Sequence, residues 1–289
     1  MPDREFDLIA WIRRSARRGR GVLNGIGDDC AVLDARGGKL LATTDVIVSG
    51  VDFVPSENPA LIGRKAANVN FSDIAAMGGR PAFLLSTLML PPGLPPGWAK
   101  KVTRGILDAC RAAGVSLVGG DLSATGGSAS VGGTALGVAK KPVLRSGARP
   151  GNAIGLTGAC GGSILGRHLR FSPRIAEGLR LAPIATAMVD VSDGLTADLD
   201  HILDQSGVGA DLVAEAIPIH RDAFRLAQKS GRTPLDHALS DGEDFELLFT
   251  CPEQRFPKWA HRIGTISRKR GLRLDGRAIK PRGYEHVLG

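Results

Sequence analysis

Aspartates recur within the apolar segments of this 289-residue sequence, and this pattern limits how the chain can fold. One of them, Asp73, continues a stripe at helical spacing in a helix predicted to start near Pro59. The stripe consists of Ile62, Ala66, Val69, Asp73 and Ala76. A carboxylate that faces a core is costly unless a metal, a cation or hydrogen-bond donors accompany it. The alternative, a local cap within residues 71–74, is disfavoured because the apolar pattern continues on both sides.

Other aspartates lie at or near the ends of short apolar runs that are predicted to be strands. They are Asp28, Asp29, Asp45, Asp121, Asp190 and Asp193. Open α/β sheets bind ligands at the carboxyl ends of their strands, and hard oxygen ligands suit Mg²⁺ or Mn²⁺, often together with substrate phosphates. Each aspartate alone is typical of a cap or a turn, so the prediction of a metal site depends on their joint recurrence. We expect Asp198 and Asp200, on the following helix, to be solvated.

The net charge is +8, with basic clusters at residues 13–20 and 268–270. Aromatic residues make up only 4% of the chain, which leaves little of the stacking surface that single-strand binders use. We therefore interpret the basic clusters as solvated helix ends and hairpin tips and predict no nucleic-acid partner. Attraction of small anionic substrates is a compatible use of the charge.

The length and a hydrophobic content of 43% are sufficient for two α/β domains. Periodicity predicts a helix at 5–20 and strands at 39–53, 115–118, 134–139 and 153–157. Residues 90–96 are predicted to be a proline-rich loop, and 272–279 a hairpin that turns at Asp275-Gly276. We place the domains at 1–142 and 143–289, with 145–151 as the connector.

Several absences narrow the class of protein. No signal-peptide core and no membrane-length apolar run occurs, which predicts a cytoplasmic protein without a membrane partner. The cysteines are far apart, which predicts reduced, buried thiols; they are Cys30, Cys110, Cys160 and Cys251. Walker, dinucleotide-binding and Gly-x-Ser-x-Gly motifs are missing, and the six histidines form no recognisable metal pair or triad.

Seven motifs, in order along nearly the whole chain, resemble those of the thiamine-monophosphate kinase family. They are residues 25–33 (GIGDDCAVL), 43–45 (TTD), 69–78 (VNFSDIAAMG), 119–121 (GGD), 145–148 (RSGA), 190–194 (DVSDG) and 241–246 (DGEDFE). The wider superfamily of aminoimidazole-ribonucleotide synthetase and selenophosphate synthetase shares the architecture and some of the aspartates.

The resemblance implies ATP-dependent phosphorylation of thiamine monophosphate to the diphosphate. It also implies an α/β (α+β), two-domain, aminoimidazole-ribonucleotide synthetase-like fold, in which the N-terminal strands form a barrel in a homodimer and the C-terminal domain is α/β. Several Mg²⁺ ions and ATP as co-substrate are implied. Carried over by position, the metal ligands are Asp29, Thr43, Thr44, Asp45, Asp73, Asp121, Asp190 and Asp193. ATP contacts are Gly120, Asp121, Arg145 and Ser192, and substrate contacts are Asp52, Glu243 and Tyr284.

No catalytic base is expected for such a reaction. An acceptor phosphate oxygen is already anionic near neutral pH, so the task is to align two mutually repelling polyanions and to neutralise the developing charge. Clustered Mg²⁺ would do this, and Arg145 would add a planar fork for phosphate oxygens.

One position departs from the family. Residues 51–53 are Val-Asp-Phe, where the family usually has Val-His-Phe, so Asp52 replaces a substrate-contacting histidine. Asp52 could face the cationic thiazolium or the aminopyrimidine, but it would repel a phosphate unless it is metal-bound. We therefore expect a substrate site that is altered in detail or in identity.

Two alternatives stay open. The first is another ATP-dependent synthetase or kinase of the superfamily with a different small substrate, although the glycine-rich N-terminal loop with reactive Cys and Lys of selenophosphate synthetase is missing. The second is an inactive nucleotide-binding relative, which retention of every proposed metal aspartate disfavours.

Overall fold

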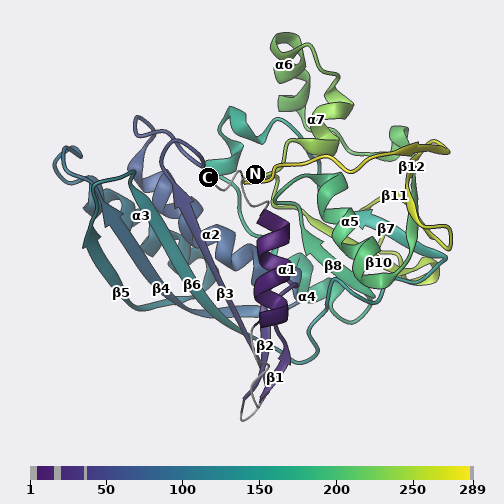
Figure 1. Cartoon of the computed structure of the whole chain (residues 1–289), viewed down its shortest axis with the longest axis horizontal. Coiled ribbons are helices and arrows are strands. Elements are labelled where there is room, and N and C mark those ends of the chain that lie inside the picture. Colours follow the sequence, from purple (N-terminus) through teal and green to yellow (C-terminus); the bar gives the residue numbers. More distant parts are fainter. Residues whose placement is uncertain (1–4, 16–20, 36–37, 287–289) are drawn as a thin grey trace.

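The computed structural model describes residues 5–15, 21–35 and 38–286 and contains two β-sheets with helices packed on them (Figure 1). The first sheet has six strands in the order β1-β2-β3-β6-β4-β5. Its strands are β1 (Val22–Asn24), β2 (Ala31–Ala35), β3 (Gly38–Val48), β4 (Arg80–Leu90), β5 (Ser116–Ala124) and β6 (Ser130–Ala139). Its helices are α1 (Glu5–Ser15), α2 (Pro59–Ala76) and α3 (Trp98–Ala113). All of its neighbouring strands are antiparallel except β4 and β5.

The second sheet has seven strands in the order β13-β12-β9-β11-β7-β10-β8. They are β7 (Asn152–Leu156), β8 (Ala187–Asp190), β9 (Gly209–Leu212), β10 (Leu247–Pro252), β11 (His261–Ser267), β12 (Gly271–Leu274) and β13 (Arg277–Ile279). Its helices are α4 (Ile175–Leu181), α5 (Leu195–Ser206), α6 (Arg221–Ser230) and α7 (Pro234–Ser240), with short 3-10 turns at 163–165, 167–169, 214–216 and 253–255.

Strand β4 shows how the first sheet is built. Its side chains alternate between the two faces, so that Leu84 and Leu88 are buried while Phe83, Leu85 and Met89 are exposed. The buried face belongs to a core that includes residues of α2 and α3. The opposite face of this sheet is therefore apolar without being covered within the described chain.

Helix α2 lies at the centre of the molecule, in contact with α3, with strands of the first sheet and with α4 and β8 of the second half. Its N-terminus is capped by Asn58, whose Oδ1 accepts from the amide of Ala60 at 3.0 Å. Two glycines bring α2 and α3 together. A Cβ on Gly63 would lie 1.9 Å from the carbonyl oxygen of Val102, and one on Gly105 would lie 1.8 Å from that of Ala60.

The structure confirms several predicted elements. Helix α2 begins at Pro59, and the hairpin of β12 and β13 turns at Asp275-Gly276. Strand β6 includes the strand predicted at 134–139, and β7 covers the one predicted at 153–157 except for its last residue. The strand predicted at 39–53 ends earlier, at Val48, because residues 48–53 fold into a hydrogen-bonded turn. The strand predicted at 115–118 continues to Ala124 along β4. Of the helix predicted at 5–20, residues 16–20 lie outside the described residues.

The two sheets divide the chain by sequence. All strands of the first sheet fall within residues 22–139, and all strands of the second within 152–279. The proposed boundary between residues 142 and 143 lies in the segment between them and stays a prediction. All four cysteines are buried and free, as expected. Among the described helices, none is long and apolar enough to span a bilayer.

Candidate functional site

A group of carboxylates lies where the two halves of the chain meet. Asp29 follows β1, Asp73 lies in the last turns of α2, and Asp190 ends β8. One oxygen from each of these three side chains lies within 4.8 Å of the others. Asp45 on β3 lies within hydrogen-bonding reach of Asp73. Four carboxylates from segments that are far apart in sequence therefore lie close together. We call them the carboxylate cluster (Asp29, Asp45, Asp73 and Asp190).

Two hydroxyl groups complete this cluster. The Thr43 hydroxyl donates to Asp73 Oδ2 at 2.6 Å, and the Ser72 hydroxyl donates to Asp190 Oδ2 at 2.5 Å. Thr43 and Asp45 point to the same side of β3 because side chains two residues apart share a face. The helical stripe that predicted an unusual role for Asp73 therefore turns this side chain toward the first sheet.

Burial is the main cause of the raised pKa values in the cluster. It raises the pKa of Asp73 well above its ordinary value, and the charges of Asp45, Asp190 and Asp29 raise it further. Burial and then the charge of Asp29 raise the pKa of Asp190 to about 7. Asp29 Oδ2 is a buried oxygen that finds no hydrogen-bond partner among the residues that the structure describes. Close, desolvated carboxylate oxygens with an unsatisfied acceptor fit a hard divalent cation such as Mg²⁺.

Arg145 is the cation that contacts this cluster. Its Nη2 lies 2.7 Å from Asp29 Oδ1, and its backbone amide donates to both carboxylate oxygens of Asp28 at 3.2 Å. Burial raises the pKa of Asp28 to about 7, with a further contribution from the charge of Asp29. The connector between the two sheets thus places a guanidinium beside the carboxylates.

The loop between β8 and α5 is organised by Asp198. One oxygen of this side chain accepts from the amides of Ser192, Asp193 and Gly194 at 3.1, 3.1 and 3.0 Å. Asp198 is only 1% exposed, so the expectation that it is solvated was wrong, whereas Asp200 is exposed as expected. The physical reason is that helical side chains tilt toward the N-terminus, so this carboxylate reaches the amides that open the helix.

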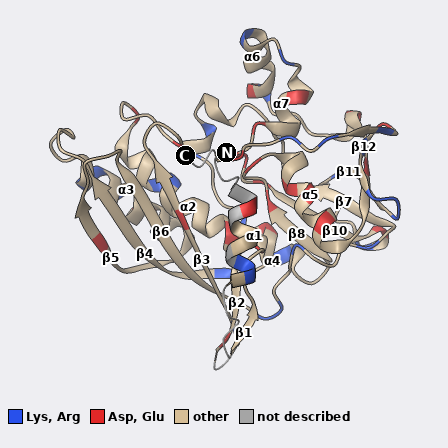
Figure 2. Ribbon diagram, in the orientation of Figure 1, with Lys and Arg blue, Asp and Glu red and all other residues tan. Residues whose placement is uncertain are grey.

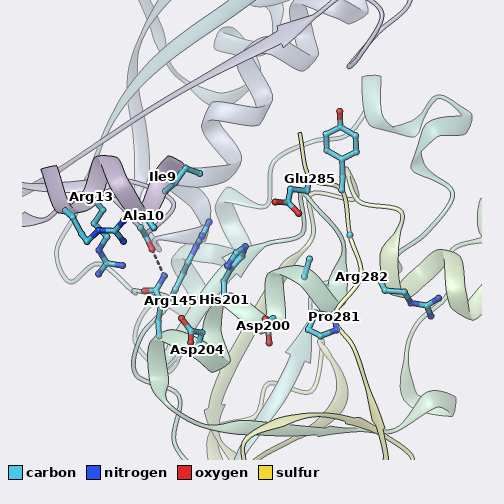
Figure 3. A pocket seen from close by; sticks show the side chains of 16 residues that line it. Ile9, Ala10, Arg13, Arg145, Asp200, His201, Asp204, Pro281, Arg282 and Glu285 are labelled. Atoms are coloured by element: carbon cyan, nitrogen blue, oxygen red, sulfur yellow. Dashed lines mark hydrogen bonds between the residues drawn. The ribbon is translucent and has the colours of Figure 1, made fainter. Parts of the chain in front are cut away.

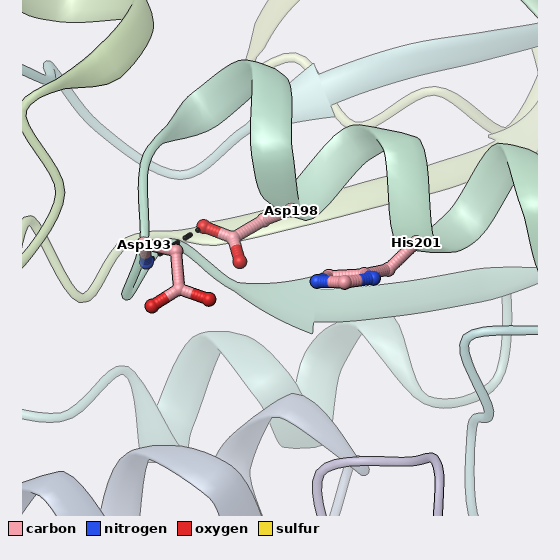
Figure 4. A group of neighbouring side chains, drawn as sticks. All are labelled: Asp193, Asp198 and His201. Atoms are coloured by element: carbon pink, nitrogen blue, oxygen red, sulfur yellow. Dashed lines mark hydrogen bonds between the residues drawn. The ribbon is translucent and has the colours of Figure 1, made fainter. Parts of the chain in front are cut away.

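A second group of metal-competent side chains adjoins this loop. Asp193, Asp198 and His201 each offer a ligand atom within 4.8 Å of the other two (Figure 4). Burial, followed by the charge of Arg145, lowers the pKa of His201 to about 4, so its imidazole is neutral near pH 7. Sequence reasoning missed His201. The three-residue spacing of Asp198 and His201 on one helix was the available signal.

The remaining predicted metal ligands lie on the opposite face of the first sheet. Thr44 points away from the cluster and donates to the Gly133 carbonyl at 2.8 Å. Asp121 pairs in register with Thr87, which is also exposed and lies two strands from β3. With strands about 4.8 Å apart, Asp121 is roughly 14 Å from β3. Within one described chain, Thr44 and Asp121 are therefore separate from the carboxylate cluster.

Gly120 precedes Asp121 and pairs with Ser86, just after an irregularity of the β4–β5 pairing. A Cβ at this position would lie 1.8 Å from the Ser86 carbonyl oxygen, so the close approach of the two strands requires glycine. The Gly-Gly-Asp motif thus has a structural reason that is independent of any nucleotide.

The predicted substrate residues come from three different segments. Glu243 forms an ion pair with Lys65, and Lys65 Nζ also donates to the Asp52 carbonyl at 2.7 Å. The Asp52 carboxylate accepts from the amide of Val48 at 2.7 Å, so in this structure it holds its own turn. Tyr284 is 49% exposed, and its amide donates to the Asp193 carbonyl at 2.9 Å. The structure thus connects Glu243 with Asp52, and Tyr284 with the loop after β8.

A cavity of about 1030 Å³ opens between α1, α5 and the C-terminal residues (Figure 3). Its lining includes Arg13, Arg145, Asp200, His201, Asp204 and Tyr284. Arginines thus lie beside acidic and imidazole groups, and Figure 2 shows basic residues at the end of α1 and acidic residues on α5. The cavity shares Arg145 with the carboxylate cluster and has the mixed charge that suits a substrate carrying both phosphate and cationic groups.

Replacement of Asp198 by alanine should destabilise the loop after β8. The Asp198→Ala variant leaves three amides without their acceptor, and we expect the free energy of unfolding to fall by about 3 kcal/mol or more. Asp200→Ala, two residues along the same helix, should change it by less than about 0.5 kcal/mol. Urea denaturation followed by circular dichroism compares the two variants, and equal losses would contradict the role of Asp198.

Divalent cations should stabilise the protein more as the pH rises. Because the pKa of Asp190 is raised to about 7 in the folded state, the metal-free protein loses stability as the pH rises from about 4 to about 7. Mg²⁺ replaces the protons and relieves this repulsion, so it should raise the Tm more at about pH 8 than at about pH 5. Calorimetry with and without millimolar Mg²⁺ measures the difference. An equal Mg²⁺ effect at both pH values would contradict the prediction.

Comparison with known proteins agrees with this architecture. The model of the AIR synthase related protein, N-terminal domain, matches residues 27–139. The thiamine-monophosphate kinase of Rhodopirellula baltica is 46% identical over 263 residues, covering 86% of this chain and 83% of the relative. That of Aquifex aeolicus is 33% identical and covers 98% of this chain and 97% of the relative.

Solved structures extend the comparison. AaThiL complexed with AMPPCP and TMP has a TM-score of 0.91 and 32% identity, covering 98% of this chain and 97% of that chain. A hydrogenase maturation protein HypE in complex with ATP has a TM-score of 0.71 but only 22% identity, so it shows the shared fold alone. These matches over almost the full length identify the chain as a member of the thiamine-monophosphate kinase family.

Proposed function

We propose that this protein transfers the terminal phosphoryl group of ATP to thiamine monophosphate, forming thiamine diphosphate and ADP. Membership of the family and the overall match to AaThiL complexed with AMPPCP and TMP support this activity. The observation that carries the proposal is the carboxylate cluster, which brings together side chains from β3, α2, β8 and the loop after β1. A reaction between two polyanions needs such a concentration of cation-binding groups.

We propose that several Mg²⁺ ions bind at this site. Asp29, Thr43, Asp45, Asp73 and Asp190 have the converging oxygen atoms that would hold them, and Asp193, in the loop that follows Asp190, is a further proposed ligand. Bound Mg²⁺ would neutralise charge on the phosphates. Thr44 and Asp121, on the other face of the sheet, stay candidate ligands from the resemblance.

The protein's own residues have the task of binding and aligning the substrates. No side chain has to remove a proton from the acceptor, since a phosphate oxygen is already anionic near neutral pH. Arg145, with one edge on Asp29, would orient phosphate oxygens through its remaining N–H groups. Gly120 and Ser192 are the proposed nucleotide contacts. Asp52, Glu243 and Tyr284 are the proposed contacts of the acceptor.

The activity is tested by phosphorus NMR of the purified protein with ATP, Mg²⁺ and thiamine monophosphate. We expect thiamine diphosphate and ADP to form only when Mg²⁺ is present. Asp73→Asn should lower kcat/KM by about 100-fold or more, because it removes charge from the centre of the cluster. Asp108→Asn on the exposed side of α3 is the matched control and should be unchanged. Binding of ATP without formation of thiamine diphosphate would refute the proposed substrate.

We also propose that two copies of the chain associate through the uncovered face of the first sheet. This face exposes large apolar side chains, namely Val46, Phe83, Leu85, Met89, Val118 and Val138. Apolar surface of this extent is typical of an interface. The barrel of N-terminal strands implied by the family resemblance would cover it, and a second copy would also face Thr44 and Asp121.

A charge on this face should separate the copies. Phe83 is 47% exposed on this face of β4, so Phe83→Asp should convert a homodimer into a monomer. Phe224→Asp on α6 introduces the same charge at another exposed apolar residue and should leave the dimer intact. Sedimentation equilibrium measures the mass against 30.2 kDa for one chain. A monomeric unaltered protein would refute the proposed dimer.

We place the reaction in the cytoplasm. All four cysteines are buried and free, and free thiols persist in reducing compartments.

A further inference from the structure

Lys65 is a buried lysine that no motif of the sequence singled out. It lies in the first half of α2 and is 0% exposed. Lysine side chains are almost never fully buried unless they are paired, because removing an ammonium group from water is costly. Here the ammonium group has two partners, the Glu243 carboxylate and the Asp52 carbonyl. These belong to two segments that are nearly 200 residues apart, and both are candidate substrate residues.

The segment that carries Glu243 is held in a strained conformation. Glu243 and Phe245 have φ values of 52° and 51°, which non-glycine residues rarely adopt. Their amides donate to the Ser192 and Val191 carbonyls at 2.7 and 2.8 Å, so this segment is attached to the loop after β8. The strain turns the Glu243 side chain toward α2, where Lys65 meets it.

Aromatic packing also supports the same segment. The ring of Phe245 stacks on that of Phe171 with 4.0 Å between centroids. The Phe171 carbonyl in turn accepts from Asn68 Nδ2 at 2.9 Å, three residues after Lys65 on α2. Helix α2 therefore supports this segment at two places. Asn68 supports Phe245 through Phe171, and Lys65 holds the Glu243 carboxylate.

The turn at residues 48–53 is the other partner. Its backbone is closed by hydrogen bonds from the amides of Val51 and Asp52 to the Val48 carbonyl, at 3.1 and 2.9 Å. The Asp52 carboxylate adds a bond to the Val48 amide. Since the carboxylate is used inside the turn, the contact that ties this turn to α2 is the one from Lys65 to the Asp52 carbonyl.

We propose that Lys65 is a positioning residue for the acceptor substrate. Its ammonium group holds Glu243 and the 48–53 turn at a fixed separation. The inference rests on the proposed function. Glu243 is 28% exposed at its side chain, and its contact to Lys65 uses Oε1. The other carboxylate oxygen, Oε2, has no hydrogen-bond partner among the described residues. Lys65 thereby orients this oxygen for the acceptor and fixes the separation of Glu243 from the turn.

The test is the Lys65→Met variant, which keeps the length and apolar stem of the side chain and removes the ammonium group. We expect the KM for thiamine monophosphate to rise about tenfold or more, because a charge-assisted contact is lost. The KM for ATP and the kcat should change by less than about threefold. Lys101→Met, the same substitution on the exposed side of α3, should alter none of these values.

Two further measurements separate positioning from general damage. If Lys65 acts through Glu243, the double variant Lys65→Met/Glu243→Gln should bind the acceptor no more weakly than the weaker single variant. Amide hydrogen exchange of the ligand-free protein should speed up at residues 48–53 and 241–246 in Lys65→Met and stay unchanged in the β-strands of the second sheet.

The outcomes distinguish failure of the proposed role of Lys65 from failure of the proposed kinase activity. An unchanged KM for thiamine monophosphate, or an equal rise in the KM of both substrates, would overturn the role of Lys65. So would unchanged exchange at both segments. If the unaltered protein forms no thiamine diphosphate, the proposed function fails, whereas the exchange data, which need no substrate, still decide whether Lys65 holds the two segments together.

Discussion

Repulsion among buried carboxylates is the constraint on which the site depends. Asp29, Asp73 and Asp190 are brought within 4.8 Å of one another by segments of both halves of the chain. Burial and mutual charge raise the pKa of Asp73 and Asp190, which means that the folded protein without a cation holds these groups at a cost. The core clusters on either side supply the stability that keeps them together. Cations bound there would relieve this cost, so that affinity for metal and retention of the fold would be linked at this point.

Arg145 and Asp198 show how the chain limits this cost without a metal. Arg145 offsets the charge of Asp29 by a contact of 2.7 Å. Asp198 adds another buried carboxylate, but it is satisfied by three backbone amides at the start of α5. The helix terminus thus supplies partial positive charge where Asp193 and Asp190 supply negative charge. Charge balance therefore explains why the connector carries Arg145 beside Asp29 and why the amides at the start of α5 surround Asp198.

Periodicity was sufficient to predict the parts of the site that lie on regular elements. The stripe on α2 predicted that Asp73 faces inward, and the apolar runs predicted that Asp190 ends a buried strand. Asp198 was misjudged because a polar residue in the first turn of a helix has the same local pattern whether it is solvated or folds back on the helix start. Lys65 was missed because its burial depends on two segments distant in sequence.

The separation of Thr44 and Asp121 from the carboxylate cluster was also outside the reach of sequence. Which face a strand residue points to follows from alternation, but the distance between two strands depends on their order in the sheet. Here β6 and β4 lie between β3 and β5, an order that involves crossovers the sequence does not show. The family resemblance predicts the same role, metal ligand, for both residues, but it does not give the distance between them within one chain.

The glycine contact between α2 and α3 has a consequence for how such a site can diversify. With Gly63 and Gly105 leaving no room for a side chain, α2 is locked to α3 and serves as a fixed frame. The groups on this frame, Asp73 and Lys65, keep their places while the 48–53 turn and the 241–246 segment can accumulate changes around them. A relative could thus acquire a new acceptor by altering the two segments that Lys65 contacts and still inherit the machinery that handles ATP.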